Sequence, residues 1–395
     1  MHPEYALPTD EQLSGALNTL KEKLDTLSKE LKKVPKTKEE TKEEKKEAGV
    51  GAVAPAEMTE EQAKKQAVDW LETAVVFKPY IDALVQEMIA SKDKKVLFLH
   101  SRSLKTLDGF FDLHLMRHAR DTLIDLCLSN NQLTSLPDTL GNLTHLTKLD
   151  VFFNQLTSLP EVIEKLTNLT KLVVSGNNLK SLPEAIGNLT NLTELSVSDN
   201  PLHILPDAIG KLTNLTELNA WGNQLTRLPD AIENLTKLTV LNIWGNKLSS
   251  LPDWIGKLTH LTMLGVHKNY LSSLPDAIGK LTHLTTLNVS DNKLTSLTKL
   301  PESIENLTNL TTLNVSRNKL TELPESIEHL TNLTTLNVSF NQLNKLPEAI
   351  KKLPLLKTLN IKGNSLLTPE YVELFKKQGL RIIHFEDQRD YRYFR

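Results

Sequence analysis

An asparagine recurs through most of this chain at a nearly constant interval, and this repeat restricts the possible folds more than any other feature. It occurs eight times at steps of 23 residues, then once after a step of 26 residues, and twice more at steps of 23. The positions are Asn131, Asn154, Asn177, Asn200, Asn223, Asn246, Asn269, Asn292, Asn318, Asn341 and Asn364. A period of this length indicates a solenoid, in which each unit completes its hydrophobic core only by stacking on its neighbours.

Aliphatic residues keep fixed distances from each asparagine. In one unit Leu215, Leu218 and the smaller Ala220 precede Asn223, and Leu225 follows it. The Leu-x-Leu alternation predicts a short parallel strand in each unit, because successive side chains of a strand point to opposite faces. The Leu-Pro pair that follows is expected to turn the chain away from the sheet, since proline has no N–H to donate. Stacked asparagine amides are expected to bond turn groups that would otherwise be buried without partners.

Eleven units, from about Leu123 to Leu367, share this spacing and these residue types. The pattern resembles the leucine-rich repeat in its 23-residue intracellular form, which occurs in Ras-group scaffolds and in bacterial proteins. The resemblance implies an α/β leucine-rich repeat solenoid, with a curved parallel sheet on its concave face. It also implies that recognition takes place on exposed residues that the repeat does not dictate.

The segments on either side of the repeats are expected to cap the open ends of the solenoid. We expect a helical N-terminal cap over 58–95 and a degenerate first repeat over 96–122, with Arg102 at the asparagine position. The repeats occupy 123–367, and 368–395 forms a C-terminal cap and tail with a helix over 369–378 and a last strand over 380–385. The step of 26 residues predicts a structural bulge near 296–299.

The N-terminal 95 residues also contain a leucine seam. Leucines separated by alternating steps of four and three residues predict an amphipathic helix within 1–34, followed by a charged, flexible linker over 35–57. The seam consists of Leu13, Leu17, Leu20, Leu24, Leu27 and Leu31, and Val34 continues it. Two interpretations stay open: a coiled-coil-like association helix for a second copy or another partner, and a helix that folds back on its own protein.

Composition excludes several classes of function. Lys and Arg number 46 against 48 Asp and Glu, so the net charge of -2 does not favour nucleic acid or an anionic membrane as the main partner. The single cysteine, Cys127, excludes an intramolecular disulfide and a cysteine-built zinc site. No apolar run is long enough for a membrane span, and we identify no secretory signal, so we expect a cytoplasmic protein. Delivery into a host cell's cytosol as an effector is the alternative location.

No catalytic constellation is visible in the sequence. Gly-Lys-Leu-Thr occurs three times, but it lacks the earlier glycine that a phosphate-binding loop needs. His114 and His118 have the i, i+4 spacing of metal ligands but no obvious third ligand, and Cys127 is interpreted as a plain free thiol. We therefore expect neither an enzyme nor a bound cofactor or metal.

Departures from the repeat identify the candidate binding residues. Two positions before the asparagine, most units carry serine, but three consecutive units do not; six positions before it, the polar series is also interrupted. The predicted partner-binding residues are Trp221, Trp244, His267, Val240, Met263, Lys268, Tyr270, and a smaller group of Phe152 and Phe153. Exposed aromatic residues of this kind are typical of interface hot spots. Glu194, Asp199 and Glu217 form an acidic strip that favours a basic partner.

These observations favour a non-enzymatic protein–protein interaction scaffold that recognises its partner on the concave face. A secreted bacterial effector that acts on host proteins is one alternative. A carbohydrate or small-ligand sensor that uses the Trp-Trp-His stripe is another.

Overall fold

The computed structural model describes residues 96–107, 122–292, 300–375 and 379–383, all of which belong to the compact unit Asp93–Arg395. The leucine-seam helix, the linker and the helical cap expected over 1–95 lie outside the described residues, and so does the bulge near 296–299. Those expectations stay predictions.

The described unit contains one parallel sheet of 13 strands, arranged in the order of the chain. Each strand pairs with the strands before and after it, so residues one repeat apart lie side by side. The strands are β1 (Val96–Phe98), β2 (Asp125–Cys127), β3 (Lys148–Asp150), β4 (Lys171–Val173), β5 (Glu194–Ser196), β6 (Glu217–Asn219), β7 (Val240–Asn242), β8 (Met263–Gly265), β9 (Thr286–Asn288), β10 (Thr312–Asn314), β11 (Thr335–Asn337), β12 (Thr358–Asn360) and β13 (Arg381–Ile383).

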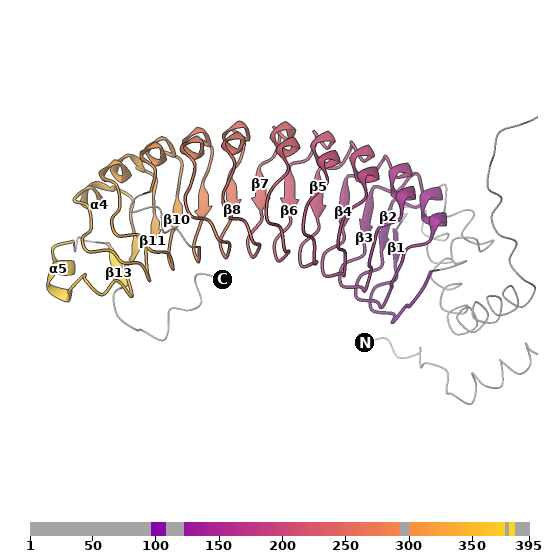
Figure 1. Ribbon diagram of the computed structural model, residues 1–395, viewed down its shortest axis with the longest axis horizontal. Helices are drawn as coiled ribbons and strands as arrows, with labels where there is room; N and C mark the ends of the chain where they lie inside the picture. Colours follow the sequence, from indigo (N-terminus) through magenta and orange to yellow (C-terminus); the bar gives the residue numbers. More distant parts are fainter. Residues whose placement is uncertain (1–95, 108–121, 293–299, 376–378, 384–395) are drawn as a thin grey trace, which may run out of the picture. The chain divides into compact units, whose positions relative to one another are not determined.

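Short helices form the layer opposite the strands (Figure 1). Most are 3₁₀ helices of five residues that begin directly after the proline of the Leu-Pro pair, as at Pro229, whose backbone is extended. They are η2 (Asp138–Asn142), η3 (Glu161–Lys165), η4 (Glu184–Asn188), η5 (Asp207–Lys211), η6 (Asp230–Asn234), η7 (Asp253–Lys257), η8 (Asp276–Lys280), η9 (Glu302–Asn306) and η10 (Glu325–His329), followed by the α-helices α4 (Ala349–Lys352) and α5 (Pro369–Glu373). A 3₁₀ helix rises further per residue than an α-helix, so it suits a unit that has few residues left to return to the sheet.

Leucines fill the space between the two layers. The central leucine of each strand from β1 to β12 is buried, and so are the leucines two positions after the asparagine in most described units; Leu218, Leu225 and Leu241 are each 0% exposed. Each side chain packs against its equivalents in adjacent units, since the parallel register aligns them. No unit could bury these residues alone, as expected of a solenoid.

The repeated asparagine joins the turn of its own unit to the turn of the unit before it. Asn177 is 6% exposed, and its Nδ2 donates to the carbonyl oxygens of Val151 (3.0 Å) and Val174 (3.0 Å). Its Oδ1 accepts a hydrogen bond from the backbone N–H of Leu156 (2.9 Å). Equivalent bonds recur at the other repeat asparagines, which confirms the role expected from the sequence.

Strands beyond the eleven regular units extend the sheet at both ends. Leu97 and Leu99 are buried beside β2, and Asn131 closes the turn of this first unit by accepting the N–H of Arg102 (2.9 Å). Near the other end, α5 precedes β13, and the Thr368 side chain caps α5 by accepting the N–H of Tyr371.

Replacement of a ladder asparagine is expected to weaken the whole stack. Asn177→Ala leaves the N–H of Leu156 buried without the Asn177 acceptor and removes one of two asparagine donors from each of the carbonyls of Val151 and Val174, so we expect unfolding to be easier by about 1–3 kcal/mol. Chemical denaturation followed by circular dichroism measures this. Asn168→Ala is the matched control, because Asn168 is exposed and bonds one carbonyl, that of Thr144 (2.8 Å). Equal destabilisation by the two variants would contradict the role assigned to the buried ladder.

Candidate functional site

Three columns of outward side chains run along the strand face, at positions six, four and two before each repeat asparagine. Neighbouring members of a column are 23 residues apart and lie on adjacent strands, about 4.8 Å from each other. Most units from β9 onward carry threonine, asparagine and serine in the three columns, as in Thr286, Asn288 and Ser290. In those units the serine hydroxyl donates to the asparagine side chain, for example Ser290 Oγ to Asn288 Oδ1 (2.8 Å).

Trp221, Trp244 and His267 replace the serine in three consecutive units, and we call these three side chains the aromatic ladder. The ring centroids of Trp221 and Trp244 are 4.7 Å apart with an interplanar angle of 0°. Those of Trp244 and His267 are 4.9 Å apart at 13°. Trp244 is therefore stacked on both faces. The two indoles are half-buried by this stacking, whereas the sequence had suggested freely exposed side chains.

The last member of the ladder is an uncharged imidazole at neutral pH. Burial lowers the pKa of His267 to about 4; the neighbouring Lys268 charge lowers it as well, and Asp291 opposes the shift. Its Nδ1 is buried and has no hydrogen-bond partner among the described residues. A neutral ring stacks on Trp244 without bringing a second positive charge close to Lys268.

Lys268 and Tyr270 occupy the turn beyond the strand rather than the ladder itself. Lys268 places its Nζ 5.6 Å from the centroid of the Trp244 ring, a cation–π distance. Tyr270 is 48% exposed and donates its backbone N–H to the carbonyl of Leu248 (2.8 Å). Both residues therefore lie in the turn after β8, next to the His267 end of the aromatic ladder.

Val240 and Met263 pair across β7 and β8 at the far end of the same strands. Met263 is 39% exposed and Val240 is half-buried. The middle column, Asn219, Asn242 and Gly265, lies between this aliphatic pair and the aromatic ladder, because outward side chains alternate along a strand. The expected single apolar patch is thus two apolar groups separated by amides.

We call the side chains of Asn219 and Asn242 the amide row. The Nδ2 of Asn219 donates to Glu217 Oε1 (2.6 Å), and the Nδ2 of Asn242 donates to Asn219 Oδ1 (2.9 Å). Asn242 Oδ1 then lies over Gly265, where a Cβ atom would be only 2.6 Å from it. Glycine at this position is what allows the amide to lie flat. Sequence reasoning missed the row because asparagine is the ordinary residue of this column from β6 to β12, where only Gly265 departs from it.

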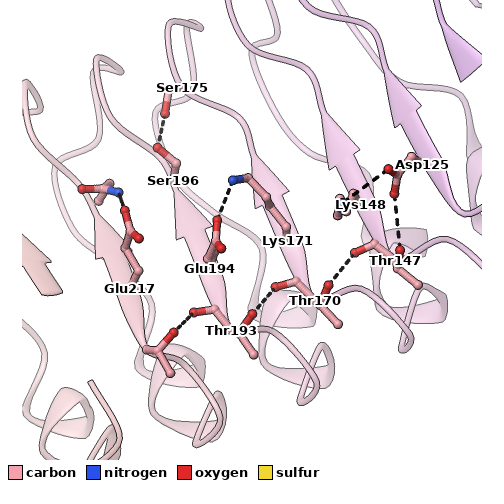
Figure 2. Close-up of polar contacts among 12 residues, drawn as sticks. Asp125, Thr147, Lys148, Thr170, Lys171, Ser175, Thr193, Glu194, Ser196 and Glu217 are labelled. Atoms are coloured by element: carbon pink, nitrogen blue, oxygen red, sulfur yellow. Dashed lines mark hydrogen bonds and ion pairs between the residues drawn. The ribbon is translucent and has the colours of Figure 1, made fainter. Parts of the chain in front are cut away.

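Charged residues cover the N-terminal half of the first column. Figure 2 shows Lys148 beside Asp125 (3.5 Å) and Lys171 beside Glu194 (2.5 Å), with a ladder of threonine hydroxyls along the strand ends. The hydrogen bond and ion pair with Glu194 raise the pKa of Lys171, and the charges of Glu217 and Asp150 act in the same direction. The field around Lys171 is therefore negative toward β6.

Phe152 and Phe153 form a second aromatic group, three units before Trp221. Their rings are 5.8 Å apart and are 40% and 58% exposed. Phe153 has a φ of 54°, in the left-handed region that bulky residues rarely adopt. Its ring lies against Gly176, where an added Cβ would be 3.2 Å from Phe153 Cδ2. The structure does not bring this pair into the aromatic ladder.

Other kinds of site are not visible in the part of the chain that the structure describes. Among those residues, no group of three or more His, Cys, Asp or Glu side chains could hold a metal ion. Cys127 is a free thiol whose Sγ lies 3.2 Å from Ser129 Oγ. No helix in the described ranges is both long enough and apolar enough to cross a membrane.

Two family models match the chain. The model described as a leucine-rich repeat region matches residues 96–220 and 200–293, and the model described as a leucine rich repeat matches 282–343 and 308–366. No match was found among curated proteins.

Solved structures share the fold. A TDR receptor is 32% identical with a TM-score of 0.60, over 69% of this chain and 47% of that one. The functional domain of InlJ from Listeria monocytogenes is 26% identical with a TM-score of 0.55, over 68% and 58%. The Arabidopsis receptor kinase HAESA, in complex with the peptide hormone IDA and the co-receptor SERK1, is 28% identical with a TM-score of 0.52, over 69% and 50%. The chain thus spans roughly half of the length of these proteins.

Acidification is expected to destabilise the fold through His267. Between pH 6.5 and about 4 the unfolded state binds a proton at this imidazole and the folded state does not, so the free energy of unfolding falls as the pH falls. We expect the wild type to lose about 1–2 kcal/mol more than His267→Gln over this range, since solvent screens a half-buried ring in part. Urea denaturation of both proteins at several pH values measures this difference. The contribution of the carboxylates, which the two proteins share, cancels when one curve is subtracted from the other. Parallel curves would show that His267 titrates normally.

Proposed function

This chain belongs to the leucine-rich repeat family, and we propose that it is a non-enzymatic scaffold that binds a protein partner on the strand face of its sheet. Domains of this family generally mediate protein–protein interaction, and its members are typically binding scaffolds rather than enzymes. The partner would contact the aromatic ladder, with Val240, Met263, Lys268 and Tyr270 beside it.

The stacked Trp221–Trp244–His267 ladder is the observation that carries this proposal. The fold does not need aromatic rings at these positions, since serine with asparagine satisfies the same columns elsewhere. The rings instead add apolar surface to a face that is otherwise polar, and that surface gains free energy when a partner covers it. Tryptophan, tyrosine and methionine together are the composition of interface hot spots.

The binding mechanism is rigid display. Stacking and the asparagine ladder hold the two indoles in one arrangement before the partner arrives, which lowers the entropy lost on binding. The receptor kinase HAESA, a structural neighbour, is in complex with a peptide hormone, and this supports an extended segment of a protein as the bound form here. Because both faces of Trp244 are already stacked, its ring offers no free face for a sugar.

A second contact remains a proposal that rests on the sequence alone. The leucine seam of Leu13 to Leu31 would supply self-association or a further partner, and a cytoplasmic location would fit such a scaffold. The leucine seam lies outside the described residues.

Restoring the repeat's own residue tests the proposal. The double variant Trp221→Ser/Trp244→Ser places the common serine in both units, so the fold should persist while each lost indole weakens partner binding by about 2 kcal/mol. Affinity purification from the native organism identifies partners by mass spectrometry, and titration then measures their affinity. Phe340→Ala is the matched control, because Phe340 is also an exposed aromatic residue but belongs to the unit of β11, far from the aromatic ladder. A partner that binds the serine variant as tightly as the wild type would refute recognition by the ladder.

A further inference from the structure

Glu217 lies beside Val240 in the first column and is a carboxylate that forms no ion pair with a described residue. The four charged residues before it in its column form two ion pairs, Asp125 with Lys148 and Lys171 with Glu194. Glu217 makes no ion pair with any described residue, and its partner is the neutral amide of Asn219 (2.6 Å). Half-buried beside this amide, it is a negative charge that a partner can neutralise.

The carboxylate also fixes which atoms the amide row presents. An ionised carboxylate can only accept hydrogen bonds, so Asn219 must turn its Nδ2 toward Glu217 and its Oδ1 toward Asn242. Asn242 in turn presents its Oδ1 over Gly265. In the serine units the equivalent oxygen accepts from a serine hydroxyl, but Trp244 has none to donate. The row therefore ends in an open acceptor.

One further accessible acceptor lies at the N-terminal end of the ladder, in the unit before Trp221. Asp199 is exposed, has no ion pair among the described residues, and places its Oδ1 3.7 Å from the Cβ position of Gly222. Ser198 stands at the ladder's own column position, is 0% exposed, and has a buried Oγ with no hydrogen-bond partner. Ser175 and Ser290, its equivalents in other units, both have partners.

These groups match the chemistry of one side chain. Arginine carries five donors and no acceptor, keeps its charge, and packs well on aromatic rings. The patch supplies acceptors and negative charge on one side of an aromatic ring, with the aliphatic Val240 and Met263 next in the same column. Lys268, 5.6 Å from the Trp244 ring centroid, shows that the far end of the ladder already holds a cation of its own.

We propose that the Ser198 end of the aromatic ladder is an arginine-binding subsite, which selects partner segments that carry an arginine beside an apolar residue. The guanidinium binds next to Trp221, where Glu217 and Asp199 supply the negative charge. The apolar neighbour packs on Val240 and Met263, and Asn242 Oδ1 accepts a backbone N–H of the segment. This inference rests on the proposed function, because it specifies the partner of the same face.

A peptide selection tests it without a known partner. A library of random 12-residue peptides displayed on phage is selected against the complete chain and, in parallel, against the Trp221→Ser/Trp244→Ser variant. Peptides that bind the wild type and not the ladder variant are expected to be enriched in arginine next to an aromatic or aliphatic residue. Enrichment of acidic peptides, or no enrichment of arginine, overturns the arginine subsite.

Charge-neutral variants then locate the contact. For a selected peptide, Glu217→Gln keeps the acceptor for Asn219 but removes the charge, so its dissociation constant should rise about tenfold. Asp199→Asn should also weaken binding, and Asp291→Asn is its matched control: both residues are exposed, and their φ values are 51° and 55°. A peptide carrying glutamate in place of its arginine should regain affinity for Glu217→Arg. Circular dichroism establishes that each variant is folded.

The outcomes separate the two proposals. If the ladder variant loses the peptides while Glu217→Gln and Asp199→Asn keep them, binding by the ladder stands and the arginine subsite is wrong. If the ladder variant binds the selected peptides as well as the wild type does, the proposed function itself fails. An equal effect of Asp199→Asn and Asp291→Asn would reduce the result to general electrostatic attraction and overturn the subsite.

Discussion

The bond from each repeat asparagine to the turns beside it is the interaction on which the rest of this structure depends. A solenoid with short strands must bury a turn in every unit, and a buried N–H or carbonyl without a partner costs about 1–3 kcal/mol. One asparagine side chain serves a donor and acceptors of two units at once, as Asn223 does for the N–H of Leu202 and the carbonyls of Val197 and Ala220. The residue is therefore the same in all eleven regular units, and its spacing sets the register of their strands.

Because leucine and asparagine complete the framework, the outward columns are free to vary, and a departure from the common residue there indicates a role other than folding.

The two phenylalanines that adopt a left-handed backbone, Phe153 and Phe340, differ in how their surroundings offset the strain. Phe340 lies over Gly363 with Arg317 Cζ 4.7 Å and Lys362 Nζ 5.7 Å from its ring centroid, so its unit compensates the strained backbone with contacts. Phe153, at 58% exposure, has the glycine and the Phe152 ring, but no cation of the described residues over its ring. Strain that local packing does not offset is expected where a residue is selected for another purpose.

Sequence periodicity was sufficient to predict the parallel strands, the asparagine ladder and the turn at each Leu-Pro pair, because each follows from one unit and its exact repetition. It could not predict the 3₁₀ form of the outer layer, which depends on how few residues remain after the strand and turns are built. It also missed the amide row. Asn219 and Asn242 look like the column's background, and their direction is set by Glu217 on one side and Gly265 on the other. Relations between units decide such features, whereas a sequence pattern describes each unit alone.

The ladder shows how a repeat fold can make a binding surface with few changes. Adjacent strands of any sheet are separated by nearly the stacking distance of aromatic rings, so rings at one position of consecutive units stack without any adjustment of the backbone. The centroid spacings of 4.7 and 4.9 Å are those of the strands themselves. Stacking leaves two polar atoms, Ser198 Oγ and His267 Nδ1, buried without partners at its two ends. The end of the ladder that carries Glu217 and Asp199, two carboxylates without an ion pair among the described residues, is thus the end that a cation would enter, rather than the covered centre at Trp244.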